Sequence, residues 1–240
     1  MANKKPVIFF LSKSGAGKDT QADLLIEKLG LSYINTGDLL RGFTSDEHLS
    51  ILDKFSVDYY EACGIRSIID KGKFIPTISV VSHWRNALLD IVREPTKTKG
   101  IIFVGVARKL GEALALHDFF ETWPDAKANF RIMPVYMKVS DKEVKKRLLV
   151  RLQCVGCKTI APGLPEYKLI EECKRCGGKL IKRKDDTPSG IVSRLGEFKE
   201  YVIPVLKYFQ EKDILITING EQSIDDVHKD VIKALHLRNI

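Results

Sequence analysis

The sequence predicts an α/β fold, a doubly wound parallel sheet flanked by helices. Two observations predict this class. Short apolar runs alternate along the chain with segments of helical periodicity, and strands that alternate with helices form parallel sheets. One run, residues 101–104, is apolar throughout, as expected of a strand buried on both faces.

The first elements follow in order from the N-terminus. A strand is expected at residues 7–11 and a short one at residues 32–34. Between them, one face of a helix that ends at Gly30 carries the apolar residues Ala22, Leu25, Ile26 and Leu29. Residues 42–95 are expected to be mostly helical, with breaks at Gly64, Gly72 and Pro76.

The second half continues the alternation. A basic helix is expected to run through Arg151. Ser189 is expected to cap a helix that Pro204 kinks, and Ser223 to cap the last helix. The remaining strands are expected at residues 101–104, 133–139 and 214–218.

Length and composition are those of a globular protein. A chain of 240 residues can bury a large core, as one α/β domain with insertions or as two small domains. Its 44% hydrophobic and 29% charged residues are ordinary values. No apolar run approaches the roughly 18–20 residues that cross a bilayer. The chain leads directly into its first strand, which leaves no room for a signal peptide, so a cytoplasmic protein is expected.

A glycine-rich turn, residues 14–20, joins the first strand to the first helix. Gly15 and Gly17 allow a tight turn with inward-pointing N–H groups, and a helix N-terminus favours anions. Lys18 can reach terminal phosphates, and Thr20 can offer a hydroxyl to a metal shell. The strict phosphate-loop (P-loop) pattern has glycine at position 12 and serine or threonine at position 19, where this chain has Ser12 and Asp19. Phosphate binding is favoured over a plain tight connection.

The positive charge is concentrated in one segment. Residues 142–194 hold 14 Lys and Arg against 6 Asp and Glu, an excess equal to the whole chain's net charge of +8. Such a segment is a solvated surface, a nucleic-acid site or a polyphosphate site. Few aromatic residues accompany it, so the stacking platforms of a nucleic-acid site are lacking.

Four of the five cysteines lie in the same segment, as two C-x-x-C pairs. Two such turns can close a tetrahedral structural zinc site, with disulfides as the alternative. The expected ligands are Cys154, Cys157, Cys173 and Cys176. Gly177 and Gly178 suit a zinc-knuckle turn, and Cys63 is left over as an ordinary thiol.

Four motifs together resemble the adenylate kinase family, in its long bacterial form with a zinc lid. They are residues 15–21 (GAGKDTQ), residues 35–41 (NTGDLLR), residues 72–76 (GKFIP), and the cysteine segment ending in Arg183-Lys184-Asp185-Asp186 and Arg194-Leu195. The resemblance implies a P-loop core with a helical nucleoside-monophosphate (NMP) insert and a zinc-binding lid insert. The implied boundaries are 1–35, 81–151 and 189–240 for the core, 36–80 for the NMP insert and 152–188 for the lid.

The resemblance also implies the roles of individual residues. ATP with Mg²⁺ is expected to bind at Gly15, Ala16, Gly17, Lys18, Asp19, Thr20, Arg147 and Arg151. The acceptor monophosphate, AMP by default, is expected at Thr36, Arg41, Ile75, Gly105, Arg108 and Glu112. Phosphoryl transfer is assigned to Lys18, Arg108, Arg151, Arg183, Arg194, Asp185 and Asp186. A monomer without nucleic-acid or membrane partners is implied.

Three positions depart from the family pattern. Val104 replaces an acid that normally holds magnesium through its waters, and Val192 replaces a lid arginine. Glu112 replaces a glutamine that reads adenine; a carboxylate cannot donate to adenine, but it can accept from guanine. Besides an adenylate kinase, the alternatives are therefore a kinase for another NMP such as GMP, a nucleotide-binding protein with impaired transfer, and an RNA-binding zinc module.

Overall fold

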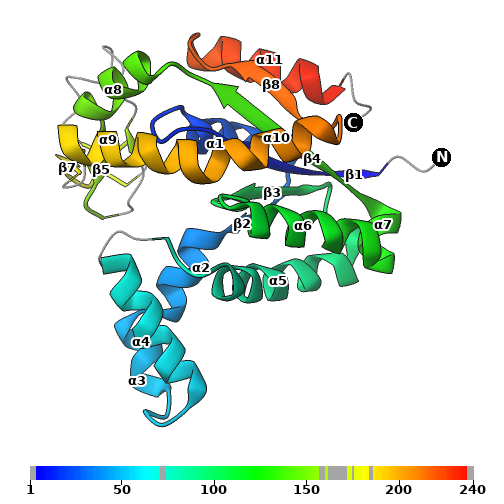
Figure 1. Cartoon of the computed structure of the whole chain (residues 1–240), viewed down its shortest axis with the longest axis vertical. Helices are drawn as coiled ribbons and strands as arrows, with labels where there is room; N and C mark the ends of the chain where they lie inside the picture. Colours follow the sequence, from blue (N-terminus) through cyan, green and yellow to red (C-terminus); the bar gives the residue numbers. More distant parts are fainter. Residues whose placement is uncertain are drawn as a thin grey trace.

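The computed structural model describes residues 4–70, 74–156, 160–161, 172–174, 176–183 and 186–236, the last without the side chain of His236. Within them, five strands form one parallel sheet in the order β2-β3-β1-β4-β8 (Figure 1). The strands are β1 (Lys5–Leu11), β2 (Ser32–Asn35), β3 (Ile101–Val104), β4 (Phe130–Lys138) and β8 (Ile216–Asn219). This confirms the predicted doubly wound sheet, with β4 starting three residues early and β8 two residues late.

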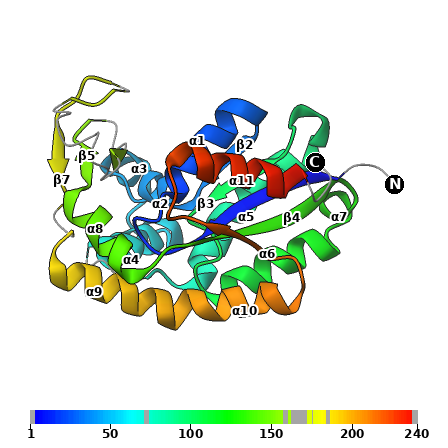
Figure 2. The same ribbon diagram turned by 90° about the horizontal axis from the view of Figure 1, so that it is seen from above.

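Apolar residues of β1 alternate between two cores. Val7 and Phe9 pack in one core, whereas Ile8 and Phe10 pack in the other. Each of the four is at most 7% exposed, so β1 lies at the centre of the sheet with both faces covered. The first core lies against α5 (Thr77–Arg93), α6 (Leu110–Thr122) and α10 (Ile203–Glu211), and the second against α1 (Lys18–Leu29) and α11 (Ile224–His236) (Figures 1 and 2).

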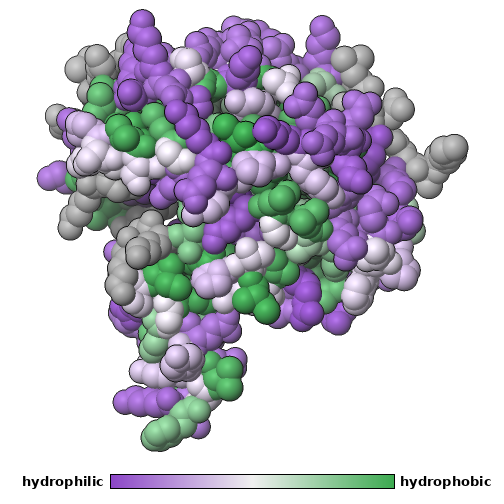
Figure 3. Space-filling view, in the orientation of Figure 1, coloured by the Kyte–Doolittle hydropathy of each residue, from purple (hydrophilic) through white to green (hydrophobic). Residues whose placement is uncertain are grey.

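A helical segment leaves the body between β2 and α5. It contains α2 (Thr36–Phe43), α3 (Asp46–Ile51) and α4 (Val57–Asp70), and α3 and α4 project away from the sheet in Figure 1. The far end of this projection, where Figure 3 shows apolar side chains, carries exposed apolar residues. They are Ile51, Phe55, Val57 and Tyr60.

The expected break at Gly64 is wrong, because α4 continues through it. A glycine inside a helix costs about 1 kcal/mol relative to alanine. The neighbouring Ala62 and Ile65 are buried at 0% and 2% exposure, and burial of their side chains offsets that cost. Gly72 lies outside the described residues, and Pro76 does precede a helix as expected, since it is the N-cap of α5.

The chain after α5 makes one 3-10 turn, η1 (Pro95–Lys97), before β3, and α7 (Pro124–Asn129) precedes β4. α8 (Asp141–Val150) is the expected basic helix. The expected cap at Ser189 is wrong: α9 (Pro188–Glu197) begins two residues earlier, where Thr187 Oγ1 accepts from Gly190 N at 3.1 Å. Both residue types cap helices, and the fixed φ of Pro188 suits the first helical position.

The helix after α9 is interrupted near Pro204, as predicted. One wider π turn, Phe198–Val202, separates α9 from α10. Proline lacks an N–H and clashes with the carbonyl four residues back, which explains the irregular turn just before it. Ser223 Oγ accepts from Asp226 N at 3.1 Å and caps α11 as predicted.

A second, antiparallel sheet stands at one end of the molecule (Figure 2). Its described strands are β5 (Leu152–Cys154), β6 (Ile160–Ala161) and β7 (Leu180–Lys182), in the order β6-β5-β7. This small sheet is contributed by the cysteine segment. Across the described part of the chain, no helix combines the length and apolar character that crossing a bilayer requires.

Candidate functional site: a P-loop cleft under an arginine cluster

The loop between β1 and α1 has the backbone of an anion cradle. Gly15 and Gly17 have φ values of +82° and +94°, a region that glycine adopts without strain. At Gly15 there is also no room for a side chain, because a Cβ would lie 2.8 Å from Leu148 Cδ2. Gly17 is the N-cap of α1 and makes no side-chain cap bond, so the helix presents free N–H groups and a positive dipole end.

This loop borders a cleft of ≈ 620 Å³ at the carboxyl ends of β1 and β3. Open parallel sheets bind ligands at this edge. Six cationic side chains line the cleft: Lys18, Arg41, Arg108, Arg151, Arg183 and Arg194. Each was a predicted site residue, and the fold brings them together from distant parts of the sequence. Their shared charge suits a polyphosphate.

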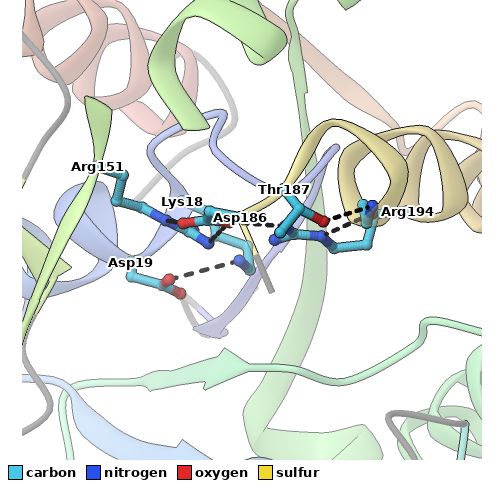
Figure 4. A network of polar contacts seen from close by, with 7 residues as sticks. Lys18, Asp19, Arg151, Asp186, Thr187 and Arg194 are labelled. Atoms are coloured by element: carbon cyan, nitrogen blue, oxygen red, sulfur yellow. Dashed lines mark hydrogen bonds and ion pairs between the residues drawn. The ribbon is translucent and has the colours of Figure 1, made fainter. Parts of the chain in front are cut away.

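A charged network beside the loop joins Arg151 and Arg194 to Asp186 (Figure 4). Arg151 donates to both oxygens of Asp186, at 2.8 and 2.7 Å, and Arg194 Nη2 donates to Asp186 Oδ1 at 2.6 Å. The Asp186 side chain is only 3% exposed, and its two partners are 11% and 17% exposed. Asp186 therefore fixes two guanidinium groups at the cleft wall, where their remaining N–H groups can bind phosphate. Asp185, its predicted companion, lies outside the described residues.

Thr36 and Gly105 lie beside Arg108, which lines the cleft. A Cβ on Gly105 would lie 3.3 Å from Arg108 Nη2 and 3.8 Å from Thr36 Cβ. The Thr36 hydroxyl is buried and has no hydrogen-bond partner within the described residues. Because buried hydroxyls are nearly always satisfied, this one suits a ligand oxygen. Arg41 lies one helical turn along α2 and pairs with Asp38.

Four of the six predicted acceptor residues are not among those that line the larger cleft: Thr36, Ile75, Gly105 and Glu112. Glu112 is 2% exposed, and its Oε2 accepts from Arg108 N at 2.9 Å. Burial raises the pKa of this carboxyl, while the Arg108 amide opposes the shift. The turn that Glu112 holds contains Ala107 at φ +54°. The carbonyl oxygen of Ile75 accepts from Lys109 Nζ at 2.9 Å, and its neighbour Phe74 lines the cleft.

A smaller cavity of ≈ 80 Å³ lies on the other side of the P-loop. It is lined by the loop residues Gly15, Ala16, Gly17, Lys18, Asp19 and Thr20, and by Arg147 and Arg151. The Arg147 guanidinium is held at 2.8 Å from Glu143 Oε1 and 3.0 Å from the Gly220 carbonyl oxygen. A guanidinium group fixed at the cavity wall can stack on a flat ring.

Residues that the sequence did not single out complete these walls. Glu143 orients Arg147 from the preceding turn of α8, a spacing of four that could have been read from the sequence. Gly220 follows β8, so its carbonyl lies at the ligand-binding edge of the sheet. Glu197 lines the larger cleft, and burial raises the pKa of its carboxyl. The sequence does not single out Glu197 as a residue of the site, since it is one acid among many on an amphipathic helix.

Three of the predicted metal ligands lie together. The sulfur atoms of Cys154, Cys173 and Cys176 lie within 4.8 Å of one another, and Cys157 lies outside the described residues. A Cβ on Gly178 would lie 2.9 Å from Cys154 Sγ and 3.3 Å from Cys176 Sγ, so this turn must be glycine to enclose the sulfurs. Three convergent thiols with a fourth cysteine in the same segment fit tetrahedral Zn²⁺. Cys63 is exposed and apart from them.

Comparison with known proteins agrees with this geometry. A family model described as adenylate kinase matches residues 10–214. The chain belongs to the adenylate kinase family. It is 30% identical to an adenylate kinase of Chlamydia pneumoniae over 233 residues, which cover 97% of this chain and 99% of the relative.

Archaeal relatives give similar values. An adenylate kinase of Archaeoglobus fulgidus is 30% identical, covering 93% of this chain and 95% of the relative. One of Methanocella arvoryzae is 32% identical, covering 92% and 94%. The family, the α/β fold and the class of kinase predicted from the sequence are thereby confirmed.

The family match does not remove the departures from its pattern. Val104 ends β3 and lines the larger cleft, where an apolar side chain cannot bind a metal ion or its waters. Val192 is 61% exposed on α9, apart from the Arg151–Asp186–Arg194 network. The structure thus has one apolar residue inside the cleft where the family pattern has an acid.

Proposed function

We propose that the chain transfers the γ-phosphoryl group of ATP·Mg²⁺ to a nucleoside monophosphate, with AMP as the default acceptor. An oxygen of the acceptor phosphate bonds to the γ-phosphorus as the bond from that phosphorus to the β–γ bridging oxygen breaks. With AMP both products are ADP. The observation that carries the proposal is the single cleft in which a P-loop faces five arginines, because such transfer needs alignment and neutralisation of charge.

The two cavities suggest how the substrates divide the site. ATP would lie with its ring at Arg147 in the smaller cavity and its phosphates on the P-loop. The acceptor phosphate would lie at Arg41 and Arg108, which line the larger cleft, and at the neighbouring Thr36. Lys18, which lines both cavities, would reach the transferred group. Arg151 and Arg194, held by Asp186, and Arg183 would stabilise the charge on that group.

Magnesium and zinc have different places in this proposal. When bound, Mg²⁺ neutralises phosphate charge, and the Thr20 hydroxyl is a hard oxygen ligand of the kind it prefers. Zn²⁺ would be structural, held by Cys154, Cys157, Cys173 and Cys176, and would stabilise the lid, residues 152–188. The remaining proposed boundaries are 36–80 for the NMP insert, with residues 1–35, 81–151 and 189–240 as the core.

The remaining proposals concern the state and place of the protein. We propose a cytoplasmic monomer without nucleic-acid partners. The proposed zinc site needs reduced cysteines, which suits a reducing compartment. The scarcity of aromatic residues in the basic segment argues against base stacking.

A coupled assay with ATP and AMP, GMP, CMP or UMP tests the proposal. Turnover with AMP at an ordinary rate, on the order of 1–100 s⁻¹, is expected. Turnover with GMP alone would contradict AMP as acceptor and keep the kinase class. No turnover with any monophosphate would contradict the proposal itself.

The variant Glu112→Gln separates two roles of Glu112. A glutamine oxygen can still accept from Arg108 N, so the holding role survives, while the new NH₂ group can donate to adenine. If Glu112 also reads the base, kcat/KM for AMP relative to GMP should rise about tenfold, the worth of one hydrogen bond. An unchanged ratio would leave Glu112 only its holding role.

Val104 favours a second candidate, a nucleotide-binding protein with impaired transfer. The variant Val104→Asp restores an acid at the end of β3. A gain in kcat of tenfold or more would support impairment of the natural site. No gain would argue against it.

A further inference from the structure

The carboxyl end of β3 provides no anionic group for a metal ion, although the cleft is built for a phosphate–metal complex. Magnesium keeps several of its waters in proteins and needs oxygen acceptors for them. Four carboxylates line the larger cleft within the described residues: Asp19, Asp23, Asp38 and Glu197. Each of these offers oxygen acceptors for the waters of a magnesium ion.

Position and partners distinguish the four. Asp38 is paired with Arg41, away from the P-loop. Glu197 lies at the end of α9, outside the P-loop and α1. Asp23 lies one turn further along α1 and lines the larger cleft but not the smaller cavity. Asp19 is the carboxylate that borders both cavities in the described structure, and Lys18 and Thr20 flank it in the chain.

An acidic side chain is unexpected in a loop that binds phosphate groups, yet Asp19 lies in this one. Its Oδ2 lies 3.4 Å from Lys18 Nζ, and its side chain is 50% exposed within the cleft (Figure 4). The Lys18 ammonium, more strongly than any other neighbour, lowers the pKa of this carboxyl, with weaker help from Arg108 and Arg151. The carboxyl group of Asp19 thus shares the phosphate cradle with the nucleotide phosphates, where a cation between the two groups can contact both.

We propose that Asp19 has taken over the magnesium-holding role of the acid missing at Val104, by accepting hydrogen bonds from the waters of Mg²⁺ bound to ATP. The acid has moved from the end of β3 to the first turn of α1, across the same cleft. Asp19 is then a positioning residue, since it acts on the metal through water. The inference rests on the proposed function, because it needs ATP·Mg²⁺ at the P-loop.

Calorimetry without an acceptor nucleotide tests this directly. The Kd of ATP is measured with Mg²⁺ and with a chelator. The value with the chelator divided by the value with Mg²⁺ is the ratio that reports the coupling between metal and nucleotide. Asp19→Asn keeps an oxygen for Lys18 but loses the charge. We expect it to reduce the ratio about tenfold, the size of typical effects of residues around metal ligands. Asp23→Asn, on the same helix, is the matched control and should leave the ratio unchanged.

A second variant tests the transfer of the role. Val104→Asp added to Asp19→Asn should restore the ratio to within about threefold of the wild-type value. Val104→Asp alone should change it little, because Asp19 already holds the waters. If Asp19 only holds Lys18 or the helix end, Asp19→Asn will weaken both Kd values equally and leave the ratio unchanged, which overturns the inference. Absence of ATP·Mg²⁺ binding in the wild type would instead overturn the proposed function.

Discussion

The central sheet and the small antiparallel sheet of the proposed zinc-binding lid depend on different atoms. In β1, the residues Val7 to Leu11 are at most 7% exposed and pack against helices on both faces. In the small sheet of the lid, Cys154 is the one buried residue of the described strands β5, β6 and β7. A core of many buried apolar groups tolerates the loss of any one of them, whereas a metal site with three or four sulfur ligands depends on each ligand. The two regions should therefore fail independently.

The largest expected effect is on the lid alone. Structural zinc contributes about 10–16 kcal/mol to folding in small sites, so Cys154→Ser or a strong chelator should unfold the lid. The measurement is hydrogen exchange at the backbone bonds Val155 N to Lys179 O and Cys173 N to Gly178 O, at 2.9 and 2.8 Å. These amides should lose protection while those of β1 keep it.

Cys63→Ser is the matched control for this experiment, because Cys63 is exposed and outside the sulfur cluster. It should leave lid exchange and metal content as in the wild type. If Cys154→Ser instead lowers protection equally in β1 and in the lid, the two regions fold as one unit and the contrast between them is wrong.

The next effect concerns the junction of the two regions, where Arg151 separates α8 from β5. Arg151→Ala should lower kcat by about 10³-fold or more, as removal of a phosphate-neutralising arginine does. The denaturant midpoint of the core should change little, because the 0%-exposed residues of β1 are untouched. Arg93→Ala is the control. The Arg93 side chain at the end of α5 is 73% exposed, so this substitution should leave kcat within twofold of the wild-type value. A loss below tenfold in Arg151→Ala would remove Arg151 from the transfer step.

A core substitution should give the opposite result. Phe9 is 0% exposed, and its ring centroid lies 5.5 Å from that of Phe209. Phe9→Ala should lower the free energy of unfolding by about 3–5 kcal/mol, from lost burial and the cavity left behind. At a temperature where the variant remains folded, kcat should stay within about threefold of the wild type.

The control uses the same residue type at the surface. Phe55 is 98% exposed at the free end of the projecting helices, so Phe55→Ala should change the free energy of unfolding by less than about 0.5 kcal/mol. Urea unfolding followed by circular dichroism measures both variants. Equal effects of the two substitutions would contradict the core assignment of Phe9.

The same contrast explains how far the sequence could predict the molecule. Apolar periodicity places β1, α1 and β3 because burial of whole faces is visible in the pattern. Helix ends were less predictable: Thr187 and Ser189 are both good caps, and only the backbone geometry of Pro188 decides between them. Gly64 shows that tertiary packing overrides a local propensity of about 1 kcal/mol.

Within the site, residue type was predictable and orientation was not. The arginines were identifiable from their motifs, and the fold brings them to one cleft. That Glu112 faces a base stays a prediction, whereas the bond that one of its oxygens accepts from the Arg108 amide was not indicated by the sequence. Only the folded turn, with Ala107 at φ +54°, brings the Arg108 amide within reach of this carboxyl group. The sequence shows which residues are charged, whereas the fold determines which groups they contact.

The smallest expected effect lies where the lid returns to the core. Thr187 Oγ1 caps α9 by accepting from Gly190 N at 3.1 Å, directly after Asp186, whose carboxylate holds Arg151 and Arg194. Thr187→Ala should cost about 1 kcal/mol, the usual value of a lost N-cap bond. If the two regions are independent, this cost should appear as increased hydrogen exchange at the start of α9 with little change in the global unfolding midpoint. Thr187→Ser, which keeps the oxygen, should restore protection. A global loss of stability in Thr187→Ala would mean that α9 transmits the state of the lid to the core, because α9 continues through the π turn into the buried helix α10.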